Sequence, residues 1–193
     1  KIFFKKYKPW GIILFTRNIK NINQTLKLTT SIRKIFNNKK YPILIDQEGG
    51  RVNRLRNIIS FDNLTSEFFG NRYVKNYNEF RFLYKLFIDK TSHLLKLIGV
   101  NINTVPVLDL RSEGASNIIG DRSFSKKSKI VSKIGDYCIQ YFHENGIGAV
   151  IKHIPGHGLA KVDSHKYTPI VDKKKNFLLK KDFAGFKKKK KFL

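Results

Sequence analysis

Short runs rich in apolar or β-branched residues recur along the chain, and each run gives way to polar residues. Four such runs occupy residues 11–15, 41–45, 100–107 and 149–151. Runs that are apolar at every position, rather than at alternate positions, are typical of strands covered on both faces, as in parallel sheets. The pattern therefore predicts four buried parallel strands.

Segments with apolar residues at helical spacing lie between these runs. They predict helices over residues 23–36, 79–97 and 125–144, each followed by Asn or Gly as a stop signal. Strands that alternate with helices form βαβ units, so the predicted fold class is α/β with a parallel sheet. The spacing between strands fits either a doubly wound sheet or a (β/α)8 barrel.

Polar side chains that could take part in binding or catalysis follow the predicted strands. Arg17, Asp46, Asp109 and the pair Lys152-His153 come after the four runs in turn. The carboxyl ends of barrel strands converge on one face, where active sites lie. A charged residue can also simply mark the point where a strand leaves the core. Four in succession favour a shared site.

The formal net charge of +25 raises the question of a nucleic-acid partner. The excess is mostly lysine and is spread along the whole chain, together with many Asn, Ile and Phe residues. These four residue types share A/T-rich codons, so genomic base composition explains the charge, and no nucleic-acid partner is expected. We interpret the lysine run at 187–191 as a solvated helix face or a chain end. No apolar stretch is long enough to span a membrane, so no membrane partner is expected either.

The cysteine count and the chain ends bear on compartment and domain organisation. A single cysteine, Cys138, rules out an internal disulfide and fits a reducing compartment, most simply the cytoplasm. The chain starts at Lys1 and contains no methionine. Although a processed mature protein would share these features, we expect residues 1–193 to be part of a larger domain, truncated at both ends.

The stretch that follows the second predicted strand combines acidic, glycine and arginine residues. Two glycines at 49–50 permit a sharp turn, which would let Asp46 point into a cavity while Arg51 and Arg54 return toward it. Carboxylates accept paired hydrogen bonds from vicinal hydroxyls and arginine donates in a fixed fork, a combination suited to sugar recognition. A surface turn with a Glu48–Arg51 ion pair is the alternative. The spacing matches no dinucleotide or P-loop motif.

Three histidines follow the fourth predicted strand in a loop rich in glycine. His153, His157 and His165 suggest zinc as one alternative, but their spacing matches no HExxH helix and no Glu or Cys completes a site. Asp163 and His165 are two positions apart and would share a side of an extended segment. A carboxylate beside an imidazole fixes its tautomer and raises its basicity, as proton transfer requires. Ser164 lacks the GxSxG surroundings of a nucleophile.

Taken together, these stretches resemble a known family. The sequence is similar to glycoside hydrolase family 3, and within it to the bacterial β-N-acetylglucosaminidases of peptidoglycan recycling. The similarity lies in GIILFTRNI at 11–19, DQEGGRVNR at 46–54, NINTVPVLDL at 101–110, GDRSF at 120–124, and KHIPGHG at 152–158 with DSH at 163–165. These blocks cover almost the whole chain.

The resemblance implies a fold, an activity and a binding site. The fold would be a (β/α)8 barrel of which about the first half is present. The activity would be hydrolysis of terminal β-linked N-acetylglucosamine from peptidoglycan-derived fragments, without a cofactor. The alternative is a non-catalytic remnant that binds sugar or, through its basic surface, nucleic acid. The residues that would bind this sugar in the −1 subsite are Asp46, Arg54, Arg122, Lys152 and His153.

The resemblance also implies a retaining mechanism. His165 would be the general acid/base and Asp163 its partner, carried by a mobile loop over residues 156–165. The family's aspartate nucleophile lies on a later strand, beyond residue 193, and no carboxylate here matches its motif. Residues 159–161 depart from the Asp-Thr-Asp-type stretch that the family usually has. Asp109 also matches a family aspartate, for which we expect a structural role.

Overall fold

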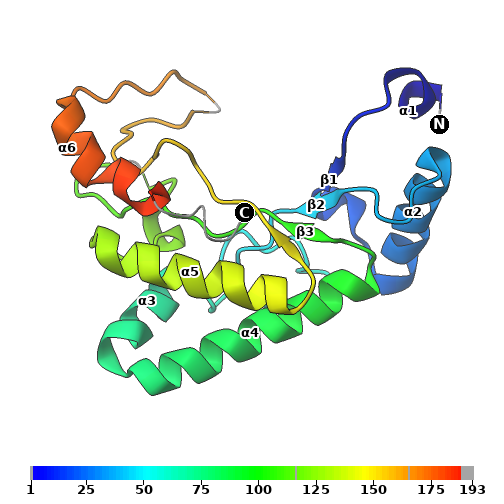
Figure 1. Ribbon diagram of the computed structural model, residues 1–193, viewed down its shortest axis with the longest axis horizontal. Helices are drawn as coiled ribbons and strands as arrows, with labels where there is room; N and C mark the ends of the chain where they lie inside the picture. The colour runs from blue at the N-terminus through cyan, green and yellow to red at the C-terminus, as the bar shows by residue number, and fades with distance from the viewer. Residues whose placement is uncertain (1, 116, 165, 188–193) are drawn as a thin grey trace.

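The fold is a four-stranded parallel sheet with helices between successive strands, as seen in a computed structural model that describes residues 2–115, 117–164 and 166–187 (Figure 1). The strands lie side by side in chain order. They are β1 (Ile12–Leu14), β2 (Ile43–Ile45), β3 (Ile102–Asn103) and β4 (Gly148–Ala149). All three pairings are parallel, which confirms the predicted strands and their direction. Strands that neighbour each other in chain order are the arrangement of successive barrel units.

The three long helices confirm the periodic pattern. They are α2 (Ile22–Phe36), α4 (Tyr77–Leu97) and α5 (Ser128–Glu144). Asn21 and Asn76 cap the first two by accepting hydrogen bonds from backbone amides at their starts, and Asn37 ends α2 in the left-handed conformation. The starts of α2 and α4 and the end of α2 are therefore set by local asparagine residues.

Several shorter elements were not predicted from the sequence. They are α1 (Ile2–Tyr7), α3 (Ser66–Lys75), α6 (Lys175–Lys180) and the 3₁₀ segments η1 (Thr16–Asn18), η2 (Gly120–Arg122) and η3 (Asp182–Phe186). Elements of one or two turns show too few positions for a helical period to be recognised. Thr65, which caps α3 by accepting from the Phe68 amide, was the available local signal.

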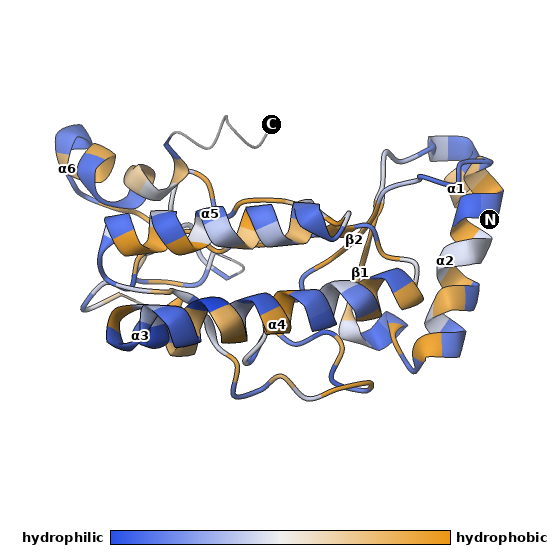
Figure 2. Ribbon diagram, turned by 60° about the horizontal axis from the view of Figure 1, so that its bottom comes forward, coloured by the Kyte–Doolittle hydropathy of each residue, from blue (hydrophilic) through white to orange (hydrophobic). Residues whose placement is uncertain are grey.

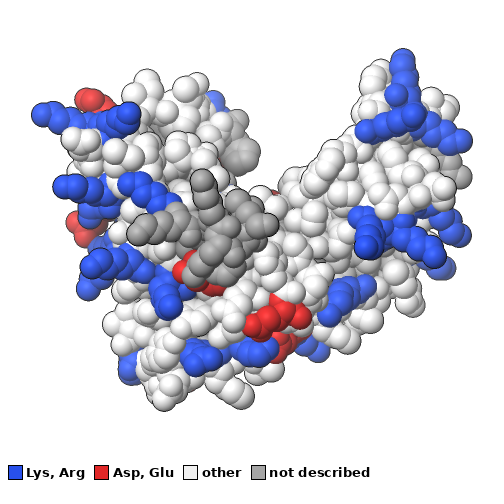
Figure 3. Space-filling model, in the orientation of Figure 1, with Lys and Arg blue, Asp and Glu red and all other residues white. Residues whose placement is uncertain are grey.

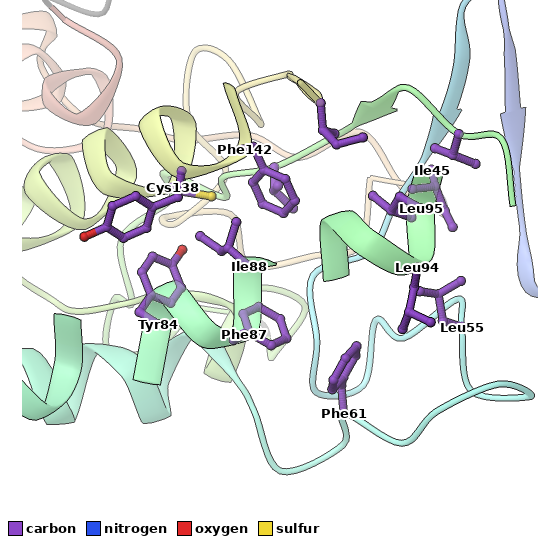
Figure 4. Close-up of a cluster of buried hydrophobic side chains, with 14 of the residues drawn as sticks. Ile45, Leu55, Phe61, Tyr84, Phe87, Ile88, Leu94, Leu95, Cys138 and Phe142 are labelled. Carbon is purple, nitrogen blue, oxygen red and sulfur yellow. The ribbon is translucent and has the colours of Figure 1, made fainter. Parts of the chain in front are cut away.

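The core lies between the sheet and the long helices. Figure 2 shows apolar and polar positions alternating around α4 and α5, as expected of helices that are buried along one side. In Figure 4, Tyr84 and Ile88 of α4 face Cys138 and Phe142 of α5, and all four are buried. Burial of each large apolar side chain contributes about 1.5–3 kcal/mol. This packing holds α4 and α5 together beneath the residues that follow β2, β3 and β4.

The two faces of the sheet are not equally covered. Leu14 is 2% exposed whereas its neighbour Ile13 is 39% exposed, and Leu44, which pairs with Ile13, is half-buried. Successive strand residues point to opposite faces, so one face of β1 is packed and the other is open. The prediction that all strands are covered on both faces is therefore wrong for β1. Figure 3 shows a broad hollow between the arm formed by α1 and α2 and the arm that carries α6.

None of the helices among the described residues combines the length and the apolar character that crossing a membrane would require.

Candidate active site

Three strand ends bring charged and polar side chains together. Asp46 follows β2 directly, Thr104 follows β3, and Lys152 lies just after β4, where it forms a parallel bridge with Val107. Lys152 Nζ donates to Asp46 Oδ1 at 2.5 Å, and the Thr104 hydroxyl donates to the same oxygen. Because the strands are parallel and in register, residues beyond their carboxyl ends meet at one edge. The predicted convergence of Asp46 and Lys152 is thus present.

Glu48 adds a second, more deeply buried carboxylate to this group. Its side chain is 3% exposed. Arg122 donates to both of its oxygens, from Nε to Oε2 and from Nη2 to Oε1, each at 2.8 Å. Lys152 Nζ lies 2.6 Å from Glu48 Oε1, so one ammonium group serves both carboxylates. Such a two-bond arginine fork fixes both position and orientation.

The suggested ion pair between Glu48 and Arg51 is absent among the described residues. Arg51 instead pairs with Asp121 at 3.0 Å and donates to the backbone carbonyls of residues 117–119. Arg51 points to this outer loop because the chain reverses at Gly49 and Gly50, whose φ angles are +91° and +55°. A Cβ atom at Gly49 would lie 2.3 Å from a backbone oxygen of residue 64, so only glycine fits there.

Ion pairing overcomes the cost of burying the two carboxylates. Burial by itself would raise the pKa of Asp46, but the charge and hydrogen bond of Lys152, with Thr104 and Arg54, bring it below its usual value. Burial would likewise raise the pKa of Glu48, and hydrogen bonding to Arg122 with the charge of Lys152 lowers it. Burial would lower the pKa of Arg122, but Glu48 raises it. All three groups are therefore charged at neutral pH.

Arg54 and Arg17 lie at the margin of this network. Arg54 Nη2 is 3.7 Å from Asp46 Oδ2, an ion pair longer than a hydrogen bond, and its guanidinium lies over the ring of Phe15 at 5.4 Å. Arg17 lies over the same ring at 4.9 Å. Within the described part of the chain, Arg17 makes no ion pair. Arg54 thus joins the network as predicted, whereas Arg17 packs beside it.

A second set of contacts is centred on Asp109, which is fully buried. Its Oδ2 is 2.5 Å from His153 Nδ1 and accepts from the His153 amide at 3.2 Å, while Oδ1 accepts from the His157 amide at 2.6 Å. A carboxylate at Nδ1 favours the tautomer with hydrogen on that atom, which leaves Nε2 as an acceptor. His153 Nε2 lies 3.4 Å from Arg122 Nη2. Asp109 therefore orients His153 toward the first network, in keeping with the structural role expected for it.

The predicted proton-transfer pair is described only in part. His165 lies outside the described residues. The backbone carbonyl of Asp163 accepts hydrogen bonds from the amides of Lys166 and Tyr167. The same-side arrangement expected of Asp163 and His165 therefore stays a prediction. Their partnership remains a prediction from the resemblance.

Zinc was an alternative reading of the three histidines, of which His165 lies outside the described residues. Among the described residues, no cluster of three or more His, Cys, Asp or Glu side chains could hold a metal ion. The rings of His153 and His157 are 6.1 Å apart between centroids.

Sequence reasoning overlooked Thr104 and gave Glu48 the wrong partner. A signal for Glu48 existed, since it lies two positions after Asp46 and residues two apart on extended chain share a side. Nothing in the local sequence marks Thr104, because a threonine within a β-branched run is ordinary.

Comparison with known proteins agrees with this arrangement. The family model described as the glycosyl hydrolase family 3 N terminal domain matches residues 3–189. The chain therefore belongs to glycoside hydrolase family 3. Its fold is accordingly the α/β fold of that domain, with its four strands forming part of a (β/α)8 barrel.

Individual relatives share the sequence and the fold. The chain is 35% identical over 178 residues to a β-hexosaminidase of Haemophilus influenzae, covering 91% of this chain and 48% of that protein. A β-hexosaminidase of Thioalkalivibrio sulfidiphilus is 34% identical over 161 residues, covering 83% and 45%. The chain thus spans about half the length of these curated relatives.

Solved structures give the same picture. NagZ from Neisseria gonorrhoeae superposes with a TM-score of 0.81 at 28% identity, covering 92% of this chain and 51% of that one. A family 3 β-N-acetylglucosaminidase from Paenibacillus superposes with a TM-score of 0.81 at 30% identity, covering 95% and 34%.

Proposed function

We propose that this chain supplies the sugar-binding half of a β-N-acetylglucosaminidase active site. The observation that carries the proposal is the network in which Lys152 joins Asp46 and Glu48 at the carboxyl ends of β2 and β4. A charged group placed there in a parallel α/β barrel is positioned for substrate rather than for packing. Similarity to β-hexosaminidases and to NagZ supports the choice of sugar.

Each side chain of the network has a role that suits its chemistry. Asp46 would accept hydrogen bonds from sugar hydroxyls, since it is ionised and its side chain is 22% exposed. Lys152 would donate to a neighbouring hydroxyl and His153 Nε2 would accept from one, and Arg54 and Arg122 would close the −1 subsite. Glu48 would hold Arg122 and Lys152 in place without touching the sugar, because its side chain is almost wholly buried.

The chemical step would follow the retaining course with an unusual acid. His165 would protonate the departing glycosidic oxygen and later remove a proton from the attacking water, with Asp163 stabilising the charged imidazole. An aspartate from the remainder of the barrel would attack the anomeric carbon and form the glycosyl-enzyme. We propose peptidoglycan-derived fragments as the substrate class and the cytoplasm as the compartment. Residues 1–193 are proposed to be one part of a larger barrel domain.

The test uses the protein expressed from its complete reading frame and an aryl β-N-acetylglucosaminide. We expect hydrolysis with the β configuration kept in the first-formed product, as seen by proton NMR. Absence of hydrolysis, or an α product, would contradict the proposal. Residues 1–193 alone should release no aryl group, because the nucleophile is not among them.

Two substitutions separate binding from proton transfer. His165→Ala should lower kcat about 100-fold or more on a substrate with a poor leaving group, and much less on a good one, because only the former needs a proton. Asp46→Asn should raise KM on both substrates, since it removes charge from the sugar contact. His143→Ala, on the exposed side of α5, is the matched control and should change neither constant. Equal losses on both substrates for His165→Ala would argue against its acid role.

A further inference from the structure

Asp182 is a buried carboxylate that the charged network above does not include. It is the first residue of η3, which packs against α5, and it is 2% exposed. The Leu159 amide hydrogen-bonds to its carboxyl group. Its Oδ1 atom has no hydrogen-bond partner within the described residues. A carboxylate buried with so little compensation is costly, which points to a role other than stability.

Two glycines of the segment that carries Lys152 and His153 close onto Asp182. A Cβ atom at Gly156, whose φ is +138°, would lie 2.6 Å from Asp182 Cβ. A Cβ atom at Gly158 would lie 3.1 Å from Asp182 Oδ1 and 2.3 Å from the backbone oxygen of Leu110. The absence of side chains therefore allows the backbone of residues 156–158 to pack directly on the Asp182 side chain.

His157, between these glycines, connects Asp182 to the candidate site. Its amide donates to Asp109 Oδ1, and Asp109 Oδ2 holds the His153 ring. Both ring nitrogens of His157 are buried and, within the described residues, have no hydrogen-bond partner. Electrostatic attraction to the His157 ring acts to lower the pKa of Asp182. Asp182 thus packs against the glycines on either side of His157, and hydrogen bonds link the His157 amide to Asp109 and Asp109 to His153.

The electrostatics of this group agree with close packing. Burial, followed by repulsion from Asp109, raises the pKa of Asp182 to about 6, while His157 and the Leu159 amide act in the opposite direction. The pKa of Asp182 therefore depends on Asp109, His157 and the Leu159 amide, and it changes if the segment that carries His157 moves.

We propose that Asp182 is a positioning residue that clamps residues 156–158 to the sheet edge and fixes where the 159–174 segment leaves the fold. That segment carries Asp163 and His165, so the clamp would set the point from which the predicted proton donor approaches the sugar. The inference rests on the proposed function. Its basis is the packing of Asp182 against Gly156, Gly158 and the Leu159 amide.

The experiment uses the protein from the complete reading frame with Asp182→Ala and Asp182→Asn. The matched control is Asp172→Asn, because Asp172 is an exposed aspartate in the 159–174 segment. Displacement of a reacting group by about 1 Å costs about 100-fold in rate. We expect Asp182→Ala to lower kcat by about 10- to 100-fold on a poor leaving group and only about threefold on a good one. Asp182→Asn, which keeps shape and an acceptor for Leu159, should recover most of the loss.

Equal losses on both substrates, or no loss, would overturn the clamp, since a merely structural role lowers both activities through the amount of folded protein. A second measurement does not need activity. Amide hydrogen exchange of His157, Leu159 and Ala160 should be about tenfold faster in Asp182→Ala than in Asp172→Asn, because these amides are protected by the clamp. Unchanged exchange would also overturn it. Failure of the wild-type protein to hydrolyse the aryl substrate counts against the proposed function alone.

Discussion

Two groups of buried carboxylates lie near the same edge of the sheet, and their charges are balanced in different ways. Asp46 and Glu48 share Lys152, and Glu48 also receives the fork of Arg122. Asp109 is held by His153 and by backbone amides, and Asp182 has a single backbone amide and the neighbouring His157. The first group is paired with permanent cations, whereas the second depends on imidazoles and amides.

The difference has a chemical consequence. Cations that never lose their proton near neutral pH keep Asp46 and Glu48 ionised, as a group that accepts hydroxyl hydrogens must be. Asp182 has no permanent cation beside it, so its burial is not fully compensated. Burial and repulsion from Asp109 therefore raise its pKa to about 6. This difference fits the proposed roles, in which Asp46 binds sugar while Glu48 holds its cations, and Asp182 supports the adjoining loop.

The largest effect on the free energy of unfolding is expected from a substitution at Lys152. Lys152→Met removes the cation that touches both Asp46 and Glu48, and it leaves a half-buried and a buried carboxylate with less compensation. We expect the free energy of unfolding to fall by about 3–5 kcal/mol at pH 7. Urea unfolding followed by circular dichroism measures it. A loss no larger than that of an exposed lysine would mean that the pair contributes nothing.

Asp182 should behave in the opposite sense. Its folded pKa of about 6 lies above that of an unfolded carboxyl group, so the folded state binds the proton more tightly. Its burial penalty is fully present above about pH 6 and is gone below about pH 4, so stability from this group rises as pH falls through that window. Asp182→Asn should raise stability by about 3 kcal/mol at pH 7 and by little at pH 4.

Unfolding of both proteins at a series of pH values from 4 to 7 gives the difference curve. Asp46 and Glu48 are present in both proteins, so their contributions cancel from the difference. Their pKa values are also lowered, so they lose their stabilising charge only at still lower pH. A flat difference curve between pH 4 and 7 would show that Asp182 titrates like an ordinary carboxyl group.

Arg122→Lys tests geometry rather than charge. Lysine keeps the positive charge beside Glu48 but cannot donate two parallel hydrogen bonds. We expect a loss of about 2 kcal/mol in the free energy of unfolding, less than for Lys152→Met. A loss equal to that of Arg122→Met would show that charge contributes nothing without the fork.

The smallest effect is expected at an exposed pair. Lys85 and Asp89 form an ion pair at 2.9 Å on the surface of α4, with side chains 48% and 41% exposed. Lys85→Ala should change the free energy of unfolding by about 0.3 kcal/mol, and less in 1 M salt. A loss comparable to that of Lys152→Met would remove the distinction between buried and exposed pairs.

The sequence alone determined the order and direction of the main elements. Runs rich in apolar or β-branched residues predict β1 to β4, and helical periods with Asn or Gly stops predict α2, α4 and α5, because period and capping are local properties. The motif blocks at 46–54 and 152–158 likewise predicted that Asp46 and Lys152 share a site. Short elements such as α3 and η3 left no comparable pattern.

Tertiary structure decided which charges meet. Glu48 pairs with Arg122, 74 positions away, rather than with Arg51, because the Gly49-Gly50 turn sends Arg51 to the outer loop. Asp182 lies buried where Gly156 and Gly158 close onto it and η3 packs against α5. Ion pairing and desolvation depend on distances between segments that the chain brings together only on folding, and no local pattern of residues encodes them.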